Sequence, residues 1–219
     1  MHNYIIMNRI DTCIPGLNEI IGGGFPKGDS IILSGPIGSG KTIFSLQYLL
    51  KSGENSLYIS FEHDINIIKE TAKEFGWHTD NNSKFRILKY DPFKLDDILD
   101  IIQDNIRDMN AKRVVLDSLS SLSLHIHDES DIRSFLLRMN KILRSTDCTA
   151  LLIVEVPYGF NNVSEGLERF VSDDALILRR RLVNDEYERL IEIAKMRGGK
   201  HSLKLHKYEI DNEGFKIIN

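Results

Sequence analysis

The chain has 219 residues, of which 42% are hydrophobic and 27% are charged. This length suits one α/β domain, since domains usually run to about 100 to 200 residues. Its 28 basic and 32 acidic residues give a net charge of -4, which excludes a global positive field that would recruit nucleic acid or anionic lipid. The two cysteines, Cys13 and Cys148, lack zinc-site spacing and favour a cytoplasmic setting. Because no apolar run approaches the roughly 20 residues of a membrane helix, we expect no membrane insertion.

Short apolar runs alternate with amphipathic segments along the chain, as is typical of a parallel sheet with crossover helices. Strands are predicted over residues 30–34, 56–61, 85–88, 113–117 and 149–154, and helices over 41–51, 66–75, 95–109 and 130–144. After residue 170 the pattern changes to extended segments over 175–181, 187–194, 203–210 and 215–218. Short polar turns join these segments, which indicates an antiparallel tail.

We therefore expect an α/β fold with a mainly parallel sheet flanked by helices and with antiparallel C-terminal strands. No repeat or linker divides the chain, so residues 1–219 are predicted to form a single domain. Within it we distinguish a lead-in over residues 1–29, a core over 30–170 and a C-terminal β segment over 171–219.

The clearest motif lies between the first predicted strand and the first predicted helix, and it fits the pattern G-x-x-x-x-G-K-[ST] of a phosphate-binding loop. Its residues are Gly35, Pro36, Ile37, Gly38, Ser39, Gly40, Lys41 and Thr42. The glycines let consecutive N–H groups turn toward a phosphate, and the helix N-terminus adds the positive end of its dipole. We expect Lys41 to face solvent and to reach the β- and γ-phosphates of ATP. Thr42 is expected to give its hydroxyl to Mg²⁺.

A second candidate ligand for the metal is Asp117, the carboxylate that ends the apolar run over residues 113–117. In a doubly wound sheet the carboxyl end of a strand lines the ligand crevice, so Asp117 is predicted to hold Mg²⁺ opposite Thr42. An apolar run that ends in aspartate is also common before an ordinary capped turn. The phosphate-binding loop nearby favours the functional interpretation.

Hydrolysis of ATP requires a group that orients and deprotonates a water molecule, and a carboxylate is the usual means. Glu62 is the best candidate because it follows the strand predicted next after the loop helix. Its alternative role is that of an exposed strand-end residue that caps the next helix, since Asp64 and Asn66 lie nearby. The expected position of Glu62 at the rim of the crevice favours its role as the catalytic base over the capping role.

Residues 14–28, which lead directly into the loop, resemble the lead-in of the KaiC-like branch of the RecA-type ATPases. Residues 60–62 resemble the strand end that carries the catalytic glutamate of that family. The next residue is His63. The KaiC domains carry a second glutamate at this position, whereas RecA carries a histidine. Residues 168–178 and 195–201 resemble two further segments of the family. The resemblance therefore implies a RecA-like P-loop NTPase fold over the whole chain.

In that family the segment that matches residues 195–201 points across a subunit interface at the γ-phosphate bound by the neighbour. The resemblance implies that Lys195 and Arg197 act in trans on the neighbour's ATP, with His201 as a weaker third contact. Two cations beside the charge that develops on the transferred phosphoryl group would lower the barrier. Considered without the resemblance, the segment is a basic hairpin edge, where lysine discourages strand-to-strand aggregation.

Together these observations predict a regulatory protein that binds ATP and Mg²⁺ and hydrolyses ATP slowly in a homo-oligomer, with a hexameric ring favoured and an unknown protein partner. One alternative is an ATP-dependent conformational switch with negligible turnover. Another is a recombinase-like ATPase acting on DNA, which the net charge disfavours. Arg179, Arg180 and Arg181 could touch a nucleic acid backbone, although a charged strand edge is the commoner explanation.

Overall fold

A computed structural model describes residues 8–91, 95–123, 129–156 and 174–218. The centre of the fold is a nine-stranded sheet with the strand order β11-β10-β9-β8-β3-β7-β6-β4-β5. Its parallel part contains β3 (Ser30–Gly35), β7 (Thr149–Glu155), β6 (Arg113–Asp117), β4 (Ser56–Ser60) and β5 (Phe85–Lys89). The four remaining strands are β8 (Asp174–Val183), β9 (Glu186–Lys195), β10 (His206–Asp211) and β11 (Gly214–Ile218).

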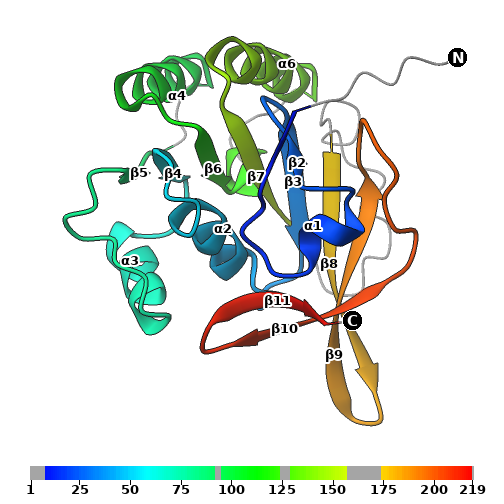
Figure 1. The fold of residues 1–219 in the computed structure, drawn as a ribbon. Coiled ribbons are helices and arrows are strands. Elements are labelled where there is room, and N and C mark those ends of the chain that lie inside the picture. Colours follow the sequence, from blue (N-terminus) through cyan, green and yellow to red (C-terminus); the bar gives the residue numbers. More distant parts are fainter. Residues whose placement is uncertain (1–7, 92–94, 124–128, 157–173, 219) are drawn as a thin grey trace, which may run out of the picture.

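Helices cover both faces of the sheet, so the molecule has three layers (Figure 1). The helices α2 (Lys41–Leu50) and α3 (Ile65–Glu74) pack on one face, while α4 (Leu95–Met109), α5 (Leu119–Ser123) and α6 (Glu129–Thr146) pack on the other. Successive side chains of the buried strands alternate between the two cores: Ile31 and Leu33 join the α2 side, and Ile32 joins the α4 side. Parallel strands covered on both faces account for the continuous apolar runs in the sequence.

The lead-in forms a small two-stranded sheet of β1 (Arg9–Ile10) and β2 (Phe25–Pro26) with the short helix α1 (Leu17–Ile20) between them. Two backbone hydrogen bonds join the C-terminal part of the chain to it. The Ile217 N–H donates to the Pro15 carbonyl at 2.9 Å, and the Ser202 N–H donates to the Ile20 carbonyl at 2.8 Å. The two ends of the described chain are therefore held together by backbone hydrogen bonds.

The expected fold class is confirmed, and the predicted core strands and helices lie within two residues of those observed. The tail is not wholly antiparallel as expected: β8 is antiparallel to β9 but parallel to β3, so it joins the tail directly to the core sheet. The predicted strand over 203–210 begins only at His206, because Leu203 is 91% exposed and has no core to pack against. The proposed boundary at residue 170 lies outside the described residues.

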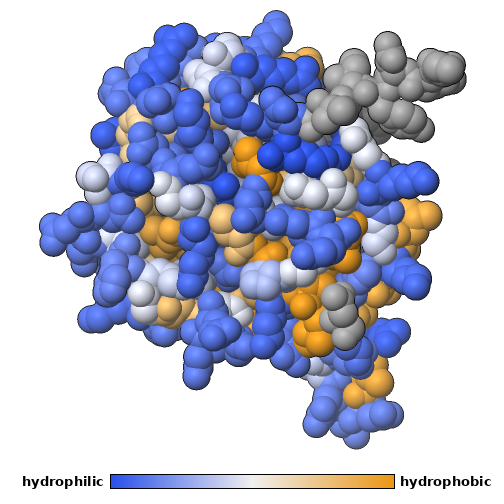
Figure 2. All heavy atoms as spheres, in the orientation of Figure 1, coloured by the Kyte–Doolittle hydropathy of each residue, from blue (hydrophilic) through white to orange (hydrophobic). Residues whose placement is uncertain are grey.

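The surface drawn in Figure 2 is mainly hydrophilic, with apolar atoms in separate areas. Within the described residues, none of the helices has the length and apolar character required to span a membrane.

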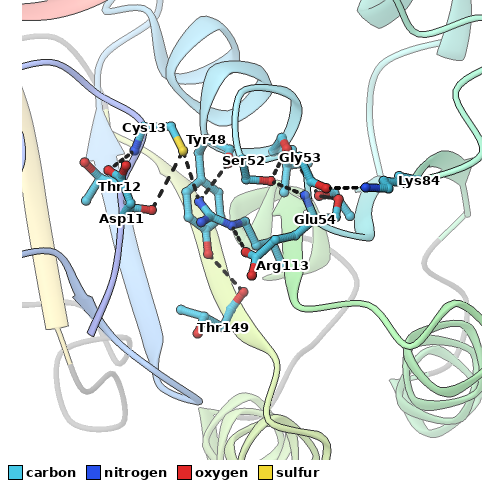
Figure 3. A network of polar contacts seen from close by, with 12 residues as sticks. Asp11, Thr12, Cys13, Tyr48, Ser52, Gly53, Glu54, Lys84, Arg113 and Thr149 are labelled. Carbon is cyan, nitrogen blue, oxygen red and sulfur yellow. Dashed lines mark hydrogen bonds and ion pairs between the residues drawn. The ribbon is translucent and has the colours of Figure 1, made fainter. Parts of the chain in front are cut away.

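A buried guanidinium joins the loop helix to the sheet (Figure 3). Arg113, the first residue of β6, donates from Nε to a Glu54 carboxylate oxygen at 2.7 Å and from Nη1 to the Tyr48 carbonyl at 3.0 Å. Its Cζ lies 4.7 Å from the centre of the Tyr48 ring. The Tyr48 hydroxyl donates in turn to the Thr149 carbonyl at 3.2 Å. These contacts fix the C-terminal end of α2 over the centre of the sheet.

Replacing Arg113 with methionine should lower the free energy of unfolding by about 2 to 4 kcal/mol, because it leaves the buried Tyr48 carbonyl without this donor and Glu54 without its counterion. Urea unfolding followed by circular dichroism measures the change. The control is Lys69→Met, which breaks the exposed ion pair with Asp80 and should leave the unfolding midpoint unchanged. Equal midpoints for the two variants would contradict this account of Arg113.

Candidate functional site

The phosphate-binding loop lies at the carboxyl end of β3 and passes directly into α2. Gly40 occupies the N-cap position of α2 with a φ of 91°, in the left-handed region that favours glycine. A Cβ atom on Gly40 would lie 2.3 Å from Ile210 Cδ1, so the position also lacks room for a side chain. Glycine therefore lets the chain turn into the helix while β10 packs closely against the loop.

Lys41 is 7% exposed, so the expectation that its side chain faces solvent is wrong. Its Nζ donates to the carbonyl oxygens of Gly35 at 3.0 Å and Pro36 at 3.1 Å. A Glu155 carboxylate oxygen lies 3.3 Å from the same Nζ. The ammonium group is thus directed back over the loop, where a phosphate held by the loop N–H groups would meet it.

The β10–β11 hairpin supports the loop from the side. The buried Tyr208 hydroxyl donates to the Ser39 carbonyl at 2.7 Å, and its ring stacks on Phe215 with 4.3 Å between the ring centres. The Phe215 ring also packs edge-on against Phe44 of α2. The Ser39 carbonyl is therefore held by the hairpin through the Tyr208 hydroxyl.

The buried Tyr58 hydroxyl interacts with both predicted metal ligands, Asp117 and Thr42. That hydroxyl donates to an Asp117 carboxylate oxygen. Burial raises the pKa of Tyr58, the Asp117 carboxylate raises it further, and a hydrogen bond with Thr42 opposes the rise. The two predicted metal ligands therefore converge on one point beside the loop.

The polar groups at this point suit a hard divalent cation, because carboxylate and hydroxyl oxygens are the ligands that Mg²⁺ prefers. Burial raises the pKa of Asp117 above its ordinary value, and the Tyr58 hydroxyl and the nearby His63 and Lys41 only partly oppose this rise. A buried carboxylate is stabilised in its charged form by an adjacent cation. Thr42 and Asp117 are thus chemically suited to Mg²⁺, and their role as its ligands stays a prediction.

Glu62 lies two residues beyond β4, at the same edge of the sheet as Asp117. The register pairs Ser60 with Asp117, and the Phe61 N–H donates to the Asp117 carbonyl at 2.7 Å. The Glu62 side chain is exposed, and one carboxylate oxygen accepts a hydrogen bond from Ser121 at 2.8 Å. Asp64 caps α3 instead, so Glu62 does not have the capping role that was its alternative.

The segment with Lys195, Arg197 and His201 lies toward the opposite end of the sheet from the loop of the same chain. Lys195 pairs with Ala175, which pairs with Ile32, and the Arg197 N–H donates to the Asp174 carboxylate at 2.6 Å. Asp174 is level with Ile31, near the start of β3. The structure therefore does not bring these residues together with their own phosphate-binding loop.

The lead-in holds this segment in place. One guanidinium nitrogen of Arg9 donates to the Gly24 carbonyl at 2.6 Å, and the other donates to the Arg197 carbonyl at 2.7 Å. The Arg197 side chain is exposed, whereas His201 is half-buried and its Nδ1 has no hydrogen-bond partner among the described residues.

Sequence analysis missed three residues of the site: Glu155, Tyr58 and Tyr208. Glu155 ends β7 as Asp117 ends β6, so the signal for a second strand-end carboxylate was present in the sequence. Tyr58 and Tyr208 lie within ordinary strand patterns. Only the pairing of strands distant in sequence reveals that their hydroxyls meet the site.

Tyr208→Phe should weaken the binding of Mg·ADP by roughly threefold to tenfold, because it removes one neutral hydrogen bond from the loop and keeps the stacked ring. Isothermal titration calorimetry gives the affinity, and thermal unfolding shows whether the fold is intact. Tyr90→Phe is the matched control, since that ring packs in the core on the other face of the sheet. An affinity equal to that of the parent would show that the hydroxyl does not position the loop.

Comparisons with known proteins agree with this geometry. The family model described as the KaiC ATPase matches residues 10–219. The UPF0273 protein PH0284 of Pyrococcus horikoshii is 32% identical, and the alignment covers 95% of this chain and 93% of that protein. Circadian clock protein KaiC3 of Synechocystis is 30% identical over 97% of this chain but only 46% of its own length, so the chain spans about half of it.

A solved structure has the same architecture. The KaiC-like protein PH0186 of Pyrococcus horikoshii superposes with a TM-score of 0.87 at 32% sequence identity, and the match covers 97% of this chain and 100% of that one. The chain therefore belongs to the KaiC family, whose RecA-type ATPase domains bind ATP.

Proposed function

We propose that the protein hydrolyses Mg·ATP in an assembly of identical subunits, in which Lys195 and Arg197 of one copy complete the site around the loop of its neighbour. The observation that carries this proposal is the position of Arg197, near the start of β3, whereas the loop lies at the other end of that strand. The three residue steps from Ile32 to Gly35 alone span about 10 Å. A second copy could supply the cations that this chain directs away from its own loop.

Within one copy, the loop N–H groups and Lys41 bind the phosphates, and Thr42 and Asp117 hold Mg²⁺. Mg²⁺ neutralises charge on the phosphate oxygens when it is bound. The Tyr58 hydroxyl orients the Asp117 carboxylate from the interior of the sheet. Glu155 lies close enough to Lys41 to hold the ammonium group near the loop.

Glu62 is the proposed base. Its carboxylate is exposed at the edge of the sheet beside Asp117, where a water molecule can reach it. The Ser121 hydroxyl restricts one carboxylate oxygen and leaves the other available to accept a proton from that water. Arg197 and Lys195 of the neighbour would stabilise the charge on the transferred phosphoryl group, with His201 as a weaker contact.

A closed ring would give every copy one loop and one set of trans cations, and a hexamer is our favoured form. The relatives that carry the name circadian clock protein favour a regulatory role over a metabolic one, exerted through a protein partner. Cys13 and Cys148 are both free thiols, which supports a cytoplasmic setting.

Glu62→Gln should keep the affinity for Mg·ATP within about twofold and reduce the rate of phosphate release by at least about a hundredfold, because the amide keeps the shape but cannot accept the proton. Lys41→Ala should instead abolish binding. Calorimetry and a phosphate-release assay separate the two effects, and thermal unfolding verifies each fold because Lys41 is buried.

The parent protein distinguishes the alternative functions. Binding of ATP without release of phosphate would favour the conformational switch, and turnover only in the presence of DNA would favour the recombinase-like ATPase.

Mixing Lys41→Ala with Arg197→Ala should restore activity that each variant lacks alone. In a closed ring formed from equal amounts, about a quarter of the interfaces would pair an intact loop with an intact Arg197. Phosphate release from the mixture measures the recovery, and sedimentation in the presence of ATP verifies that both variants assemble. A mixture that assembles but remains inactive would rule out catalysis in trans and leave residues 195–201 as a basic hairpin edge.

A further inference from the structure

The β8–β9 hairpin continues past the phosphate-binding loop and projects from the body of the molecule (Figure 1). The parallel pairing of β3 with β8 reaches Ser34 and Ile177, and a Cβ atom on Gly35 would lie 2.9 Å from Leu178 Cβ. The residues of β8 after Leu178 therefore lie beyond the carboxyl end of β3, where the loop turns back into α2. The hairpin brings three consecutive arginines to this position.

The three arginines alternate between the two faces of the hairpin. Arg179 donates from Nε to Glu192 at 2.7 Å, and Arg181 donates to Glu188 at 3.0 Å. Both acceptors belong to β9, so Arg179 and Arg181 are each held by a carboxylate of the hairpin. Because successive strand residues point to opposite faces, Arg180 points the other way.

Arg180 lies against the loop. Its Nη1 is 3.4 Å from the position that a Cβ atom would take on Gly38, whose φ is 74°. Its Cζ lies 4.5 Å from the centre of the Tyr187 ring, so a cation–π contact limits the conformations of the side chain. Burial raises the pKa of Tyr208, whose hydroxyl binds the Ser39 carbonyl, and the nearby positive charges of Arg189 and Arg180 oppose this rise.

A guanidinium in this position has the chemistry that a nucleotide requires. Its planar set of donors binds two phosphate oxygens at once, and such charge-assisted bonds are about twice as strong as neutral ones. Gly38 is exposed and has no side chain, so nothing at that residue separates the guanidinium from an anion held by the loop N–H groups. The ring of Tyr187 orders the long side chain in advance, which lowers the entropy lost on binding.

We propose that Arg180 binds the phosphate chain of the nucleotide held by its own loop, as a cation supplied in cis by the hairpin. This inference rests on the proposed function, because it requires a nucleotide in the loop. It differs from the action assigned to Arg197: Arg180 contributes to affinity for ADP and ATP alike, whereas Arg197 contributes to turnover of the neighbour's ATP.

The test compares Arg180→Gln with Arg181→Gln, which removes the same charge from the other face of the same strand. Calorimetry with Mg·ADP should show about a tenfold loss of affinity for Arg180→Gln and less than about a twofold change for Arg181→Gln. Arg180→Lys should give an intermediate loss, because it keeps the charge without the bidentate geometry. Unchanged thermal unfolding midpoints would show that the hairpin is intact.

The inference would be overturned if Arg180→Gln bound Mg·ADP as tightly as the parent, or if Arg181→Gln lost as much affinity as Arg180→Gln. It would also be overturned if Arg180→Gln lost affinity only together with a lowered unfolding midpoint, while Arg180→Lys kept the parent affinity. The proposed function fails separately, since it requires that the parent chain bind Mg·ADP and that Lys41→Ala lose this binding. A parent chain that binds and an Arg180→Gln variant that binds equally well would refute only the role of Arg180.

Discussion

The contact between the β10–β11 hairpin and the phosphate-binding loop is the interaction on which the proposed site depends. Ile210 packs where a side chain on Gly40 would otherwise lie, and the Tyr208 hydroxyl fixes the Ser39 carbonyl. A loop that binds phosphate through backbone N–H groups needs its carbonyls directed elsewhere. The last strands of the chain thus support the proposed nucleotide site, although they lie far from the loop in sequence.

The positions of β8 and β9 explain how one short C-terminal region could serve the two proposed sites. β8 pairs with β3 from Ile31 to Ser34 and then continues beyond it, so the hairpin turn lies at the loop end while Lys195 lies toward the other end. Arg180 is therefore near the loop of its own chain, and Arg197 is held by Arg9 and Asp174 at the opposite end. If both proposals hold, the same part of the chain presents one cation to its own nucleotide and others to that of a neighbour.

The sequence correctly predicted those parts of the fold that depend on residues close to one another in the chain. The loop motif and the strand at 113–117 were predicted correctly because glycine spacing and a buried apolar run each act over a few residues. The lead-in elements, α5 and the start of β10 were not predicted, since short elements and exposed leucines carry no periodic pattern. Tyr58 and Tyr208 were not predicted because strand order, which is a long-range property, brings them to the site.

The most direct test of the account is a crystal structure of the protein with Mg²⁺ and a non-hydrolysable ATP analogue. The account predicts that Lys41 Nζ contacts the phosphates within its own chain and that the Arg197 guanidinium nearest the γ-phosphate belongs to an adjacent copy. It would be contradicted by an analogue bound away from residues 35–42, or by a γ-phosphate that meets Arg197 of the same chain.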